Sequence, residues 1–130
     1  MVEYNIGFDF HGVLNKYPMK FHKLMEDLIK TKNNIYIISG PPYTQIQEEL
    51  RNAGYICLIH YHHIISVVDY LKRSKAKMYQ DAKGDWWTDN DTWWKSKANI
   101  CKENSIQILY DDKIEYSKTM DENTLFLHVQ

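Results

Sequence analysis

Strand-like and helix-like segments alternate along the whole chain, and this alternation constrains the fold more than any other feature of the sequence. Residues 17–31 are predicted to form an amphipathic helix, because their apolar side chains recur every three or four positions. We expect strands at 2–9, 33–40, 55–59, 106–110 and 125–129, and further helices at 41–53, 64–71 and 95–104. Such alternation predicts an α/β fold, with a five-stranded, mainly parallel sheet between two helical layers.

Length and composition restrict the classes of protein that need to be considered. A chain of 130 residues suits a single domain over residues 1–130. The net charge of −1 gives no strong nucleic-acid signal. Cys57 and Cys101 form no close pair, and no apolar run is long enough to cross a membrane. We therefore expect a soluble, cytoplasmic protein without a membrane partner.

Small or acidic residues end three of the predicted strands. These residues are Asp9, Ser39 and the pair Asp111-Asp112. Because ligands bind outside the carboxyl ends of strands in open α/β sheets, we expect the side chains to converge there. Three carboxylates at such density favour Mg²⁺, and Ser39 could donate hydrogen bonds to a phosphate. Taken singly, each residue could equally be a turn former or a helix cap; Asp111-Asp112 would then cap a helix near Lys113.

Four short motifs, in order, resemble those of the haloacid dehalogenase-like (HAD) hydrolases. They are "DFHGVL", "IISG", a lysine in "WKSKANICKEN" and "ILYDD". The resemblance covers residues 4 to about 118 and implies a HAD-like Rossmannoid three-layer α/β/α sandwich. It also implies an aspartyl-phosphate on Asp9.

The same resemblance assigns the other site residues. Ser39, Gly40 and Gly12 would contact the substrate. Lys97 would be a catalytic residue that steadies both the phosphate and the nucleophile, with Lys95 as the competing lysine. The Mg²⁺ ligands would be Asp9, the backbone carbonyl of His11, Asp111 and Asp112.

His11 departs from the family pattern, which has a second aspartate at this position. That aspartate acts as general acid and then as general base, and a histidine can also exchange protons near neutral pH. His11 is therefore a candidate catalytic residue. The alternative is that His11 is a structural or impaired replacement, in which case turnover is slow or lost.

The stretch "CLIHYHH" could suggest zinc, because Cys57, His60, His62 and His63 are all metal-ligating types. Their spacing matches no closed tetrahedral pattern, so hydrogen-bonded or solvated histidines are the better interpretation.

The tryptophan-rich segment, about residues 75–94, is too short for a full cap domain. It is predicted to be a loop or a small lid that stacks on a base or another aromatic group. The alternatives are packing against the sheet edge and a homo-oligomer contact through Trp86, Trp87, Trp93 and Trp94. Asp85, Asp89 and Asp91 resemble a calcium loop only superficially.

The sequence thus predicts a Mg²⁺-dependent phosphohydrolase acting on a small phosphate monoester. The motifs look most like small phage and bacterial relatives of the 5′(3′)-deoxyribonucleotidases, which makes a nucleoside monophosphate the favoured substrate. A phosphorylated macromolecule is a second possible substrate. Two further hypotheses are a catalytically impaired module that binds a nucleotide or phosphate, and an interaction protein that dimerises through the tryptophans.

Overall fold

The computed structural model describes residues 3–130 and has a five-stranded sheet at its centre. The strand order is β3-β2-β1-β6-β7, and each pair of neighbours is parallel. The strands are β1 (Asn5–Phe8), β2 (Asn34–Ser39), β3 (His63–Ser66), β6 (Ile108–Asp111) and β7 (Leu125–His128). The predicted α/β class and the parallel five-stranded sheet are confirmed, and the arrangement is a Rossmann-like sandwich.

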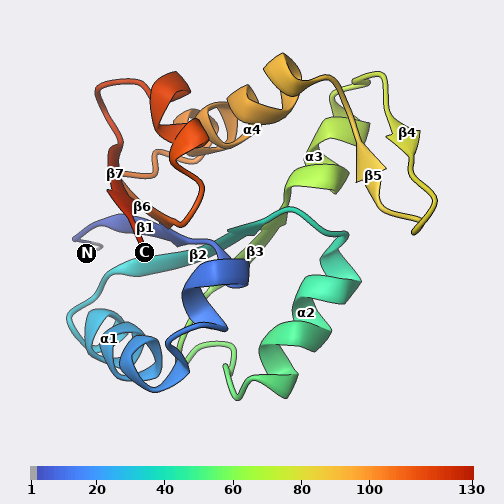
Figure 1. Cartoon of the computed structure of the whole chain (residues 1–130). Helices are drawn as coiled ribbons and strands as arrows, with labels where there is room; N and C mark the ends of the chain where they lie inside the picture. Colours follow the sequence, from blue (N-terminus) through green and yellow to red (C-terminus); the bar gives the residue numbers. More distant parts are fainter. Residues whose placement is uncertain (1–2) are drawn as a thin grey trace.

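Helices cover both faces of this sheet (Figure 1). Helices α1 (Pro18–Lys30) and α2 (Tyr43–Asn52) lie on one face, and α3 (Val67–Arg73) and α4 (Asn90–Glu103) lie on the other. Two short segments follow strand ends. The segment η1 (Phe10–Leu14), in which His11 and Gly12 are not helical, comes after β1, and the helical turn η2 (Ile114–Thr119) comes after β6. The loops that follow strand ends, where the predicted site residues occur, thus lie between two helical layers.

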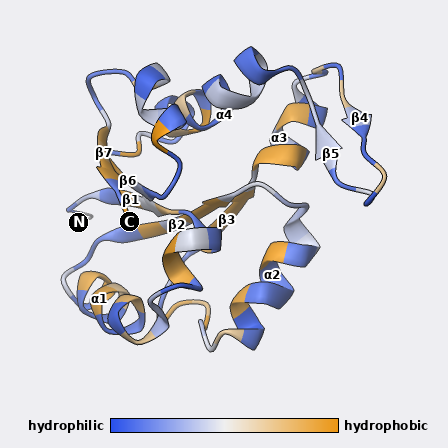
Figure 2. Cartoon of the chain, viewed as in Figure 1, coloured by the Kyte–Doolittle hydropathy of each residue, from blue (hydrophilic) through white to orange (hydrophobic). Residues whose placement is uncertain are grey.

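The core consists of two apolar clusters, one on each face of the sheet. On β2, Ile35 and Ile37 join the cluster with α1 and α2, while Ile38 joins the cluster with α3 and α4. This division follows from the alternation of side chains along a strand. Figure 2 shows the same pattern, with hydrophobic strands at the centre and helices that are polar on their outer faces.

The third strand lies further along the chain than predicted. Residues 55–59 form no strand of the sheet; instead, the backbone N–H of Ile56 donates to Nδ1 of His60 (2.8 Å) and the N–H of His60 donates to the Ile56 carbonyl (2.8 Å). These bonds close a tight turn, and Leu58 within it has a positive φ of 72°. The apolar run 55–59 was therefore wrongly assigned, because local composition does not reveal which segment pairs with β2.

The helix predicted from Ile64 begins only at Val67, since Ile64 and Ile65 pair with β2 as part of β3. In contrast, α4 begins at Asn90, earlier than the predicted Lys95, because the Asp89 carboxylate accepts a hydrogen bond from the Thr92 N–H (3.0 Å). Val2, which was expected to open the first strand, lies outside the described residues.

The spacing of Thr44 and Gln47 in the sequence predicts a capping box at the start of α2, and this prediction is wrong. Thr44 and Gln47 have the required spacing, but the helix begins one residue earlier, at Tyr43, with Pro42 as its N-cap and no side-chain cap. Instead, a carboxylate oxygen of Asp69, on α3, accepts a hydrogen bond from the Tyr43 N–H (3.0 Å).

The tryptophan-rich segment contains a small antiparallel hairpin between α3 and α4. Its strands are β4 (Tyr79–Gln80) and β5 (Trp86–Trp87), joined by a turn in which Asp81 accepts hydrogen bonds from the N–H groups of Lys83 and Asp85. The hairpin projects near the beginning of α2 (Figure 1). None of the helices within residues 3–130 is both long and apolar enough to span a membrane.

Candidate active site at the carboxyl ends of the strands

Three carboxylates come together where β1 and β6 end. Asp9 directly follows β1, Asp111 is the last residue of β6, and Asp112 follows it. One oxygen from each carboxylate lies within 4.8 Å of the others. The expected convergence of these residues is therefore present, and it results from the parallel pairing of β1 with β6.

Lys97 reaches this cluster from α4 and is almost completely buried. Its Nζ lies 2.5 Å from Oδ2 of Asp111 and 3.2 Å from Oδ1 of Asp9. The competing Lys95 is exposed and lies 3.8 Å from Asp91, so it does not reach the carboxylates. The sequence contained a signal for this choice, since Lys97 precedes Ile100 and Cys101 by three and four residues and shares their buried face.

Burial and charge affect Asp9 and Lys97 in different ways. Burial raises the pKa of Asp9 to about 7; Lys97 opposes this shift, and the negative charge of Asp111 adds to it. Burial also disfavours the charged form of Lys97, but the attraction of Asp111 and Asp9 is stronger in sum and raises its pKa above the ordinary value. Lys97 thus stays charged, whereas ionisation of Asp9 is costly in the absence of a further cation.

The donor set fits a divalent cation. When all three carboxylates are ionised, the single ammonium of Lys97 leaves two negative charges uncompensated. Oδ1 of Asp112 is buried without a hydrogen-bond partner, which is costly for a carboxylate unless a cation contacts it. Oxygen ligands of this kind suit Mg²⁺, and Asp9, Asp111 and Asp112 are the side chains that would hold it.

Gly12 is required beside Asp112 for two reasons. Its φ is 79°, which lies in the left-handed region that favours glycine, and a Cβ at this position would overlap with the Asp112 carboxylate. The N–H of Gly12 donates to the side chain of Asn15 (2.7 Å). The turn after β1 can therefore pass close to the acidic cluster only because residue 12 has no side chain.

Ser39 ends β2, next to β1 in the sheet, and is completely buried. Its hydroxyl oxygen has no hydrogen-bond partner. Ser39 is consequently no cap for α2, and its hydroxyl can bind an oxygen of a ligand. The following residue, Gly40, is held by its carbonyl, which accepts a hydrogen bond from the Val68 N–H (3.1 Å).

Asp111 is not the cap of a regular helix. Its Oδ1 accepts a hydrogen bond from the N–H of Lys113 (2.9 Å), which closes a turn before η2, while Oδ2 contacts Lys97. The N-cap of η2 is Lys113, so neither Asp111 nor Asp112 caps this turn.

The side chain of His11 is half exposed and contacts a residue that the sequence did not single out. Its Nε2 lies 2.6 Å from Oε2 of Glu49, on α2. Glu49 is 38 positions away in the sequence and sits among other polar residues of a surface helix, so no local pattern could have identified it.

Tyr116 is a second residue that the motifs did not indicate. It lies on η2, and Nζ of Lys97 is 4.7 Å from the centre of its ring. Burial raises the pKa of its hydroxyl to about 12. Tyr116 thus covers the ammonium with an aromatic face and excludes water from the Lys97–Asp111 ion pair.

A cavity of about 380 Å³ opens beside this site. Its lining contains His11 and Gly40 together with Trp86, Trp87 and Trp93. Three of the four tryptophans thus lie near two predicted site residues, His11 and Gly40, whereas Trp94 packs elsewhere, against Tyr116.

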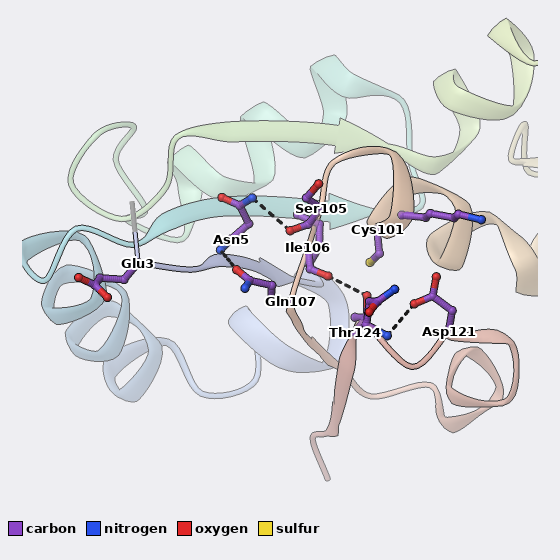
Figure 3. A pocket seen from close by; sticks show the side chains of 10 residues that line it. Glu3, Asn5, Cys101, Ser105, Ile106, Gln107, Asp121 and Thr124 are labelled. Atoms are coloured by element: carbon purple, nitrogen blue, oxygen red, sulfur yellow. Dashed lines mark hydrogen bonds between the residues drawn. The ribbon is translucent and has the colours of Figure 1, made fainter. Parts of the chain in front are cut away.

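A larger cavity, of about 530 Å³, lies at the opposite end of the strands, near the amino ends of β1, β6 and β7 (Figure 3). Its polar groups bond to one another: Asn5 Nδ2 donates to the Ser105 carbonyl (3.1 Å), and the Thr124 hydroxyl donates to the Ile106 carbonyl (2.7 Å). The residues that line this cavity include no group of carboxylates as close together as Asp9, Asp111 and Asp112.

Metal-ligating residues elsewhere are used in other ways. Among residues 3–130, Asp9, Asp111 and Asp112 form the group of acidic, histidine or cysteine side chains close enough to share a metal, and Cys57 and the histidines of 60–63 are not part of such a group. Asp89 caps α4, so the superficial resemblance of Asp85, Asp89 and Asp91 to a calcium loop has a structural explanation.

Comparison of the chain with protein-family models, with curated proteins and with solved structures gave no match. The resemblance to the HAD hydrolases thus rests on the motifs quoted above and stays a prediction.

Proposed function

We propose that this chain is a Mg²⁺-dependent phosphomonoester hydrolase of the HAD type, with Asp9 as the nucleophile. The observation that carries this proposal is the position of the Asp9 carboxylate. It lies buried after the central strand, 3.2 Å from the ammonium of Lys97 and within 4.8 Å of oxygens of Asp111 and Asp112. A carboxylate in these surroundings suits attack on a phosphate that is neutralised from several sides.

In the proposed reaction, an oxygen of Asp9 attacks the phosphorus atom and the bond from phosphorus to the leaving oxygen breaks. The leaving oxygen takes up a proton and departs as an alcohol. Water then attacks the phosphorus of the aspartyl-phosphate, which releases inorganic phosphate and regenerates the Asp9 carboxylate.

The buried cation and hydroxyl have separate roles in this proposal. Lys97 holds Asp9 in place and offsets negative charge on the phosphoryl oxygens. The unpartnered hydroxyl of Ser39 donates a hydrogen bond to a phosphoryl oxygen. Mg²⁺, held by Asp9, Asp111, Asp112 and the backbone carbonyl of His11, would supply charge neutralisation and favour the ionised form of Asp9.

His11 occupies the position of the second aspartate of the HAD motif. Its side chain lines the cavity next to the site, where a leaving group would lie, and Glu49 contacts its Nε2. In the hydrolase, His11 exchanges the proton with the leaving oxygen, and Glu49 holds the imidazole in position.

One observation favours a second candidate function, a binding module that has lost turnover. The usual aspartate is absent, and Nε2 of the replacing histidine is already engaged by Glu49 at 2.6 Å. Such a module would keep the metal site and the phosphate contacts but would release no phosphate.

Phosphate release from a panel of nucleoside monophosphates and sugar phosphates, with and without Mg²⁺, tests these alternatives. For the hydrolase we expect metal-dependent turnover that Asp9→Asn abolishes. The matched control Asp91→Asn removes an exposed carboxylate on the first turn of α4 and should leave turnover unchanged.

The variant His11→Asp separates an evolved acid–base group from an impaired one. If wild-type protein binds Mg²⁺ but shows no turnover from pH 5 to 9, and His11→Asp restores it, the binding module is the correct function. If His11→Asp lowers the rate of an active wild-type protein, His11 is part of the catalytic machinery.

A further inference from the structure

The cavity beside Asp9 has three tryptophan rings in its lining, and the phosphate chemistry alone does not require them. Trp86 and Trp87 come from β5, and Trp93 comes from the first turn of α4. Pro41 and Pro42, which follow the Ser39-Gly40 loop, line the same cavity. An aromatic and apolar space therefore begins where the proposed phosphate site ends.

Trp87 and Trp93 form an angled wall rather than a closed stack. Their ring centres are 5.1 Å apart and their planes are inclined by 46°. The indole N–H of Trp87 donates to Oδ2 of Asp81 (2.8 Å), so the polar edge of this ring is satisfied within the hairpin. With 38% of its surface exposed, Trp87 keeps apolar ring surface available for a ligand.

Trp93 connects this wall to the candidate active site. A Cβ placed on Gly40 would lie 3.7 Å from the six-membered ring of Trp93, so this ring lies against the loop that follows Ser39. A ligand whose phosphate contacts Ser39 and Gly40 thus has the tryptophan wall within reach of its leaving group.

The remaining lining residues supply charge and hydrogen-bonding groups. Trp86 is held from one side by Lys72, whose Nζ lies 4.0 Å from the ring centre. Gln45 offers both a donor and an acceptor to the cavity, and Asp85 offers acceptors. A planar ring with hydrogen-bonding edges matches this combination better than a sugar or an aliphatic chain.

We propose that the cavity binds the base of a nucleoside monophosphate, with the base stacked on the wall formed by Trp87 and Trp93. This inference rests on the proposed function, because it places the phosphate of the same ligand at Ser39 and Gly40. In this proposal, the tryptophan hairpin is the element that selects the substrate.

The test compares the binding of adenosine monophosphate and ribose 5-phosphate to the full chain in the presence of Mg²⁺, by equilibrium dialysis. The two compounds share the phosphate and the sugar and differ in the base. Each is bound to Asp9→Asn protein, which excludes turnover, and to the same protein with Trp87→Ala, Trp87→Phe or Tyr4→Ala. Tyr4 is a suitable control, because it is an exposed aromatic residue just before β1 and does not line the cavity.

We expect the nucleotide to bind at least tenfold more tightly than ribose 5-phosphate, and Trp87→Ala to weaken nucleotide binding about tenfold or more, as loss of a base–aromatic stack does. Trp87→Phe should retain most of the affinity, and Tyr4→Ala all of it. Equal binding of the two compounds, or an equal effect of Trp87→Ala on both, would overturn the inference.

The outcome also distinguishes this inference from the proposed function. A base preference that depends on Trp87, found together with no phosphate release from wild-type protein, supports the base site and refutes the hydrolase. Phosphate release at equal efficiency from both compounds supports the hydrolase and refutes the base site.

Discussion

At the scale of single residues, Asp9 meets two requirements that oppose each other. A nucleophile must be ionised, whereas burial and the neighbouring Asp111 favour the protonated carboxyl group and raise the pKa of Asp9 to about 7. Lys97 reduces this effect but does not remove it, because its shorter contact is with Asp111. Without a further cation, the site therefore holds a carboxyl group that is costly to ionise.

This conflict predicts a dependence of stability on pH. Because the pKa of Asp9 is higher in the folded than in the unfolded chain, folding favours the protonated form, and the stability of the metal-free protein falls as pH rises from about 4 to 7. The Asp9→Asn variant lacks this contribution, so the wild type should lose on the order of 2 kcal/mol relative to the variant between pH 5 and 8. Urea unfolding at both pH values measures the difference, and parallel pH profiles would contradict the assignment.

Gly12 allows a second prediction, because Gly84 provides a matched control. Both residues have a positive φ, of 79° and 86°, but only a Cβ at position 12 would overlap with the Asp112 carboxylate, whereas at position 84 the nearest atom lies 3.6 Å away. Each change to alanine should cost about 1 kcal/mol of stability through the backbone conformation.

Only Gly12→Ala should also weaken Mg²⁺ binding, since it displaces a candidate ligand. Isothermal titration with Mg²⁺ and urea unfolding of both variants separate the two effects. Equal Mg²⁺ affinity of the two variants would remove Asp112 from the ligand set.

At the scale of elements, the ends of the helices depend on side chains that the local pattern did not indicate. Ser66 caps α3: its hydroxyl accepts a hydrogen bond from the Asp69 N–H (3.0 Å) and donates one to the Pro41 carbonyl (2.6 Å). It thereby joins the start of α3 to the loop after β2. Thr44, which has the spacing of a cap, makes no such contact, because α2 begins after Pro42.

The variants Ser66→Ala and Thr44→Ala should therefore differ. Loss of the Ser66 cap, together with the loss of a partner for the partly buried Pro41 carbonyl, should cost about 1 to 2 kcal/mol. The exposed Thr44→Ala change should stay within about 0.5 kcal/mol of the wild type. Thermal unfolding of both variants provides the measurement, and a larger effect at Thr44 would show that α2 is capped by its own side chain.

At the scale of the whole molecule, the layer of α1 and α2 is joined through a histidine pair, the half-buried His22 and the buried His60. His22 of α1 contacts the Ala53 carbonyl through Nε2 (3.0 Å), and its ring lies 5.0 Å from that of His60. His60 is buried, and Glu26 is its nearest carboxylate, at 3.7 Å. Burial, aided by His22, lowers the pKa of His60 in spite of Glu26.

This pair predicts sensitivity to acid. The folded chain favours neutral His60, so its contribution to stability is complete above the ordinary pKa of 6.5 and is lost as pH falls through the lower pKa of the folded state. The His60→Gln variant, which has no imidazole to protonate, should lose less stability than the wild type between pH 6.5 and 4.5.

His63→Gln, at an exposed position of β3, serves as the control and should follow the wild type. Urea unfolding across this pH range is the measurement. An unchanged acid response of His60→Gln would assign the acid sensitivity to other groups.

Local patterns in the sequence predicted the class of fold and most of the candidate site residues, but not Glu49 or Tyr116. Apolar alternation and helical periodicity are local, so they identified β2 and α1 closely, and acidic or small residues at strand ends identified Asp9, Ser39, Asp111 and Asp112. Since parallel strands all have their carboxyl ends on the same side of the sheet, the fold class alone predicted that these side chains would lie close together.

Features that depend on contacts between distant segments became visible only in the tertiary structure. It placed β3 at His63–Ser66 rather than 55–59, because pairing with β2 selects a strand that local composition does not distinguish. It brought Glu49 to His11, because this contact joins two different elements. The tryptophan wall beside Gly40 arises in the same way, since the hairpin, α4 and the loop after β2 are far apart in the sequence and come together only in the folded chain.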